Sequence, residues 1–68
     1  MKLTTIAYFI AVAEAGSIRA AAQRLYIAQP SLTKAIQLME EELGVRLFTR
    51  TNTGIQLTDA GESILPQA

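Results

Sequence analysis

The chain has 68 residues, six of them basic and six acidic, and half are hydrophobic, which suits one small folded domain better than a disordered segment. It contains no cysteine and no histidine, which excludes a disulfide framework and a thiolate zinc site and removes the commonest general base. No cofactor or metal is therefore expected, and without a membrane-spanning run or a signal-peptide pattern we expect a cytoplasmic protein with no membrane contact.

Residues 2–15 are predicted to form the first helix. One face carries apolar residues at helical spacing: Leu3, Ile6, Phe9, Ile10 and Ala13. Gly16 is suited to end this helix, because a left-handed backbone costs glycine little. Tyr8 and Val12 form a second, weaker apolar row, which indicates either ordinary surface residues or a contact with a partner.

Residues 17–43 are predicted to form two helices joined by a tight turn. Ser17 can cap the first helix by accepting from an unpaired N–H group. The second begins near Gln29 and Pro30, since proline is tolerated in a first turn. Each helix has an apolar stripe, composed of Ile18, Ala21, Ala22 and Leu25 in the first and Leu32, Ile36, Met39 and Leu43 in the second. This is the layout of a helix-turn-helix, whose second helix places its N-terminal residues against base edges.

A two-stranded wing is expected next, after Gly44 ends the helix. Residues 45–47 and 55–57 alternate between apolar and polar, which predicts two short strands around the polar tip T-R-T-N-T-G. Thr58 then offers a cap for a fourth helix, which Pro66 would kink or end. The predicted fold class is mainly α, a winged helix-turn-helix with three helices, a two-stranded wing and the start of a linker helix.

The predicted core joins residues from all these elements: Ile6, Phe9, Ile10, Ile18, Ala21, Leu25, Leu32, Ile36, Met39, Leu43, Leu47 and Leu57. The acidic run Glu40–Glu42, at the far end of the second motif helix, is interpreted as a solvated face.

Three stretches in uninterrupted order resemble the N-terminal domain of LysR-type transcriptional regulators. They are A-E-A-G-S-I-R-A-A-A-Q-R-L, Q-P-S-L-T-K-A-I-Q-L-M-E-E-E-L-G-V-R-L-F-T-R and G-I-Q-L-T-D-A-G-E, and together they span essentially the whole chain. The resemblance implies a DNA-binding domain at residues 1–57 and the start of a dimerising linker helix at residues 58–68. It also implies a larger regulator, dimeric on an inverted-repeat site in double-stranded DNA. A small effector bound by a domain absent from this chain would govern transcription.

The resemblance further implies contacts with DNA. Bases in the major groove would be read by Gln29, Pro30, Ser31, Thr33 and Lys34. The backbone or a groove would be contacted by Ser17, Arg19, Gln37, Arg50, Thr51, Asn52, Thr53 and Thr58. Dimer contacts are expected at Tyr8, Val12, Ile64 and Leu65. Chemically, Gln29 can pair bidentately with adenine, and Lys34 can donate to guanine or phosphate. Instead of contacting DNA, Ser17 and Thr58 could simply cap their helices, and Arg50 could form an ion pair on the surface.

Three positions depart from the family pattern. Ala28 stands where many relatives have a Ser or Thr cap, Lys34 where arginine is usual, and Thr53 where a basic wing-tip residue is common. Lysine lacks the planar fork of arginine, so base specificity at Lys34 is reduced. Together with zero net charge, these departures predict modest affinity for DNA.

Two other functions are compatible with parts of the sequence. A winged-helix interaction module that has lost DNA binding fits the zero net charge, because a basic footprint is typical of nucleic-acid-binding proteins, but the polar face from Gln29 to Lys34 argues against it. An enzyme fragment is disfavoured, because the few acidic residues show no pairing that suggests a catalytic site.

Overall fold

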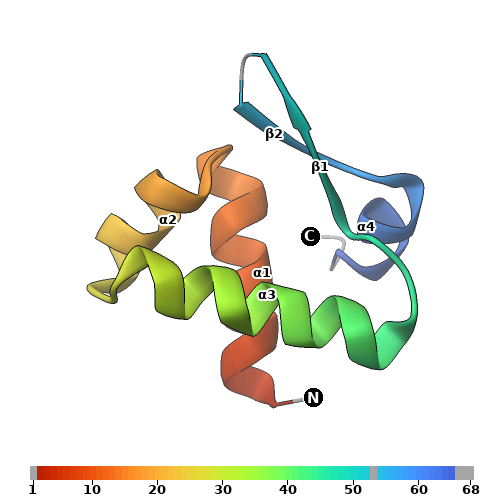
Figure 1. Cartoon of the computed structure of the whole chain (residues 1–68), viewed down its shortest axis with the longest axis horizontal. Coiled ribbons are helices and arrows are strands. Elements are labelled where there is room, and N and C mark those ends of the chain that lie inside the picture. The colour runs from red at the N-terminus through yellow and green to blue at the C-terminus, as the bar shows by residue number, and fades with distance from the viewer. Residues whose placement is uncertain (1, 53, 66–68) are drawn as a thin grey trace.

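The computed structural model describes residues 2–52 and 54–65. Its elements are α1 (Leu3–Ala15), α2 (Ile18–Leu25), α3 (Gln29–Leu43), β1 (Phe48–Thr51), β2 (Gly54–Leu57) and α4 (Asp59–Ile64). The first three helices pack together with α3 crossing α1, and the β1–β2 hairpin rises beside them (Figure 1). This arrangement confirms the predicted winged helix-turn-helix fold.

The ends of the helices follow from local chemistry. Gly16 has φ +76° and donates its N–H to the Val12 carbonyl at 2.9 Å, which closes α1. Ser17 caps α2 by accepting from the Ala20 N–H at 3.0 Å. Gly44 closes α3 in the same way, with φ +71°. The capping predictions are thus confirmed, and α1 begins at Leu3, one residue later than expected.

The core lies where α1, α2, α3 and the start of the wing meet. Its buried residues are Phe9, Val12, Ala21, Ala22, Leu32, Ile36, Met39, Leu47 and Phe48. The rings of Phe9 and Phe48, 5.4 Å apart between centroids, link α1 to β1.

The predicted core was only partly right. It omitted Val12, Ala22 and Phe48, and six predicted members are only half-buried: Ile6, Ile10, Ile18, Leu25, Leu43 and Leu57. On α1 the cause is helix phase. The helix packs against both α2 and α3, so its buried face centres on Phe9 and Val12, while Leu3 is 85% exposed.

The first strand of the wing lies further along the chain than predicted. β1 begins at Phe48, so Thr49, Arg50 and Thr51 are strand residues, and the predicted strand start at Val45 is wrong. The strands are antiparallel, with Phe48 opposite Leu57 and Thr51 opposite Gly54. Residues 45–47 form a connecting segment instead, because its backbone bonds to α3 and to residue 58 rather than to a strand partner.

α4 packs against the base of the wing. Thr58 caps it, accepting from the Gly61 N–H at 3.0 Å, as the sequence predicted. Gly61 lies against the Leu47 carbonyl so closely that a Cβ there would clash with that oxygen and lie 2.8 Å from the Leu57 Cδ2. Within residues 2–52 and 54–65, no helix has the length and apolar character needed to cross a membrane.

Candidate nucleic-acid interface

The first turns of α3 present a polar face to solvent. Leu32, Ile36 and Met39 turn inward to the core, and this phase leaves the polar positions between them outside. The exposed residues include Gln29, Pro30, Ser31, Lys34 and Gln37, and Thr33 is half-buried. A shallow hollow on this face is lined by Gln29, Pro30, Thr33, Lys34 and Gln37. Apart from Ser31, the structure therefore gathers the residues predicted to read bases.

The N-terminus of α3 has no side-chain cap. Ala28 occupies the capping position and makes no side-chain hydrogen bond, as expected from the missing hydroxyl. Its carbonyl accepts from the Ser31 N–H at 3.1 Å and the Leu32 N–H at 3.2 Å. Proline near the helix start has no N–H to leave unpaired.

A second hollow joins the starts of α2 and α3 to the wing. Its lining comprises Ser17, Ile18, Arg19, Gln29, Arg50, Thr51, Gly54 and Ile55. The Ile55 N–H donates to the Gly16 carbonyl at 3.3 Å, which fixes β2 beside the α1–α2 turn. Gly54, at φ +140°, permits this approach, because a Cβ there would lie 3.0 Å from the same carbonyl.

A third hollow lies between α3 and the wing. It shares Thr33 and Gln37 with the first hollow and Ile18, Arg50 and Ile55 with the second. The polar face of α3, the start of α2 and one side of the wing thus adjoin one another and form one continuous surface.

The first and second hollows carry only basic charges, whereas the third is lined by Glu40 together with Arg46 and Arg50. Lys34 lines the first hollow, Arg19 and Arg50 line the second, and no carboxylate is among the residues that line either one. The acidic residues lie at the ends of α1 and α3 and on α4. Zero net charge therefore coexists with a locally basic surface, which answers the objection raised by composition alone.

Some predicted contacts fall outside this surface. Thr58 lines none of the three hollows, and its hydroxyl, besides capping α4, donates to the Arg46 carbonyl. The Ser17 hydroxyl is also occupied by its capping bond, although Ser17 lines the second hollow. Asn52 is exposed in the turn of the wing. Thr53 lies outside the described residues.

The predicted dimer contacts differ in their exposure to solvent. Val12 is completely buried, so the prediction that it contacts a partner is wrong. Tyr8 and Leu65 are half-buried and pack against the core, while Ile64 is 37% exposed. The Tyr8–Val12 row belongs to the interior because α1 is covered on two sides.

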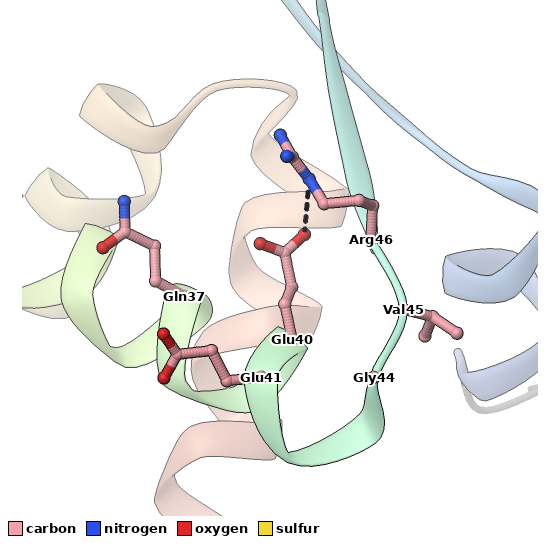
Figure 2. A pocket seen from close by; sticks show the side chains of 6 residues that line it. All are labelled: Gln37, Glu40, Glu41, Gly44, Val45 and Arg46. Carbon is pink, nitrogen blue, oxygen red and sulfur yellow. Dashed lines mark ion pairs between the residues drawn. The ribbon is translucent and has the colours of Figure 1, made fainter.

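Sequence reasoning missed Glu40, which is not part of a solvated face. Its side chain is 15% exposed, and Oε2 accepts from the Leu47 N–H at 2.7 Å and the Phe48 N–H at 3.4 Å. Figure 2 shows the carboxylate directed toward Arg46, whose Nε lies 3.9 Å away, while Glu41 points elsewhere. A signal was present, since Glu40 follows Ile36 by four residues and so lies on the buried side of α3.

Comparison with known proteins gives a consistent result. The family described as "Bacterial regulatory helix-turn-helix protein, lysR family" matches residues 3–62. Among curated relatives, the HTH-type transcriptional regulator ClcR of Pseudomonas putida is 53% identical over all 68 residues, which span 23% of ClcR. The chain spans about a quarter of the length of such relatives.

Solved structures match equally well. The crystal structure of the CbnR_DBD-DNA complex is 49% identical with a TM-score of 0.91, over 96% of this chain and 75% of that one. The BenM_DBD/benA site 1 DNA complex is 42% identical with a TM-score of 0.91, over 96% and 76% respectively. At these identities the likeness extends beyond the fold to the sequence of the domain.

Proposed function

This chain belongs to the lysR family of bacterial regulatory helix-turn-helix proteins, and we propose that it binds double-stranded DNA sequence-specifically to regulate transcription. The observation that carries the proposal is the exposed polar start of α3, which includes Lys34 and lies beside Arg19 and Arg50. No carboxylate lines the first or the second hollow. The similar domains of CbnR and BenM were solved as DNA complexes, which supports the same partner here.

The start of α3 would enter the major groove. That groove is about 12 Å wide and admits one α-helix. Gln29 would pair with adenine through its amide, and Lys34 would donate to guanine or to a phosphate. Ser31 and Thr33 offer short hydroxyls at the same helix start, and Pro30 offers an apolar contact. Since Lys34 lacks the arginine fork, discrimination would rest mainly on Gln29.

Phosphates would be held on both sides of α3. Arg19 lies at the start of α2, and Arg50 and Thr51 lie on β1, so contacts from these two elements would flank the groove that α3 enters. Gln37, one turn beyond Lys34, would add a peripheral contact. Such contacts fix the register of a protein on the duplex and carry no base information themselves.

The remaining proposals concern the whole regulator. A two-fold dimer joined by the linker helix would place two α3 helices roughly 34 Å apart on an inverted repeat. A small effector bound outside this chain would govern the outcome, and the cytoplasm is the compartment that this function requires. We infer no catalytic role, since the relatives are named as transcriptional regulators.

Selection from a random oligonucleotide pool tests the proposal. The chain should enrich a defined sequence and bind it more tightly than a scrambled duplex of the same length. The logarithm of the affinity should fall linearly with the logarithm of salt concentration, because phosphate contacts release counterions. An interaction module without DNA-binding function would give no enrichment and no salt dependence, and this outcome would overturn the proposal.

A further inference from the structure

We propose that Glu40 is a positioning residue for DNA binding, which anchors the wing to α3 and thereby sets where Arg50 lies relative to the bases read by α3. The inference rests on the proposed function and adds to it a residue that makes no contact with DNA itself. It starts from a half-buried carboxylate whose bonds leave its own helix.

The bonds of Glu40 are made to the base of the wing. One oxygen accepts from the backbone N–H groups of Leu47 and Phe48, the last residue before β1 and the first residue in it. A carboxylate forms stronger hydrogen bonds with N–H donors than a neutral acceptor does. The nearby Arg46 contributes little, because its side chain is 81% exposed and its Nε is 3.9 Å away.

The anchor lies two residues from Arg50. Side chains two residues apart leave the same face of a strand, so Phe48 and Arg50 share one side of β1. Phe48 is buried against Phe9, whereas Arg50 is exposed and lines the hollow that also contains Thr33 and Gln37. Fixing the backbone at Phe48 therefore fixes the place from which the Arg50 guanidinium reaches toward DNA.

A double-mutant cycle separates positioning from general stability. The cost of Arg50→Ala in affinity is measured in four backgrounds: wild type, Glu40→Ala, Glu40→Gln and the matched control Glu41→Gln. Glu41 is adjacent on α3 and exposed, and its substitution removes one negative charge from the same helix without touching the anchor. The probe is the duplex that the chain selects from a random pool, at a temperature where circular dichroism shows every variant folded.

The expected result is strong coupling between residues 40 and 50. Arg50→Ala should cost the same factor in wild type and Glu41→Gln, and at least about threefold less in Glu40→Ala. Glu40→Gln keeps a neutral acceptor and should fall between them. An equal cost of Arg50→Ala in wild type and in folded Glu40→Ala would overturn the proposal, because Glu40 would then support the fold alone.

Amide hydrogen exchange tests the anchor without DNA. The Leu47 and Phe48 amides should exchange faster in Glu40→Gln than in Glu41→Gln, even if Glu40→Ala does not fold. If these two amides exchanged at the same rate in both variants, the claim that Glu40 anchors the wing would be overturned. Failure of the wild-type chain to bind any duplex would instead overturn the proposed function, so the two failures can be told apart.

Discussion

Tyr26 bears backbone strain at the centre of the helix-turn-helix. It ends α2 with φ +57°, a left-handed conformation that costs a non-glycine residue roughly 1–2 kcal/mol, and its side chain is 94% exposed. Tyr26→Gly should remove this strain at the price of greater freedom in the unfolded chain, roughly 0.5–1 kcal/mol. We expect a net gain of up to about 1 kcal/mol in the free energy of unfolding, measured by urea denaturation.

Tyr26→Ala is the matched control. It removes the same exposed ring but keeps the Cβ that makes the left-handed conformation unfavourable, so it should leave stability nearly unchanged. If alanine and glycine gave the same stability, the strain attributed to the backbone would have to be assigned to the tyrosine ring instead.

At the scale of the element, the phase of α3 can be tested by neighbouring substitutions. Ile36 is 5% exposed and faces the core, whereas Leu38 on the same helix is 49% exposed. Ile36→Ala should cost about 2–5 kcal/mol, because it leaves a cavity between helices, and in so small a domain this can abolish folding. Leu38→Ala should have a much smaller effect on the melting temperature, and a reversed order would show that the helix is rotated.

The division of labour between α3 and the wing is the second prediction at this scale. Gln29→Ala should relax preference at one base pair, at roughly 1–3 kcal/mol of discrimination. Arg50→Ala should weaken binding to all sequences alike and lower the salt slope by about 1. Competition titrations with selected and scrambled duplexes measure both effects. Equal losses on both duplexes for both variants would contradict separate roles.

Local signals predicted the four helices and the second strand, and long-range contacts explain what was missed. Gly16, Ser17 and Gly44 act within one helical turn, so the helix ends could be predicted from sequence. Phe48 could not be assigned to the core, because strict alternation along a strand would point its side chain away from the face that Leu47 occupies. In the structure both side chains are buried. Leu47 precedes the strand and its carbonyl lies against Gly61, while Phe48 packs on Phe9.

The same distinction applies to the interface. The exposed positions from Gln29 to Lys34 follow from the helical spacing around Leu32, and the sequence predicted them. The proximity of the wing to the α1–α2 turn depends on the contact between Gly54 and Gly16, which lie far apart in the sequence. The buried role of Glu40 depends likewise on backbone groups seven and eight residues away.

At the scale of the whole molecule, the 68-residue polypeptide is expected to be monomeric or weakly dimeric at micromolar concentration. A stable interface takes about 800 Å² from each partner. The large exposed hydrophobic residues come from separate parts of the chain: Leu3, Tyr26, Leu38, Val45 and Ile64. Sedimentation measures the assembly state, and a tight dimer at nanomolar concentration would contradict this expectation.

Tethering two copies should raise the affinity for an inverted repeat. When one copy is bound, the second binds intramolecularly, which typically gains about 10²–10⁴ in affinity if the tether spans both half-sites. A tandem chain with a flexible linker, compared on one and two half-sites, provides the measurement. If the tandem chain bound the duplexes with one and with two half-sites equally tightly, its two copies would not be binding both half-sites at once.

The hydrogen bond from Ile55 to Gly16 holds β2 against the α1–α2 turn before any DNA is present. The conformational entropy of the β2 backbone is therefore lost during folding, and association with DNA does not incur that loss a second time. The entropic cost of binding then comes mainly from the loss of rigid-body motion and from the ordering of exposed side chains such as Arg50. Calorimetry should accordingly give a heat-capacity change in proportion to the buried contact area, without the larger change that accompanies folding coupled to binding.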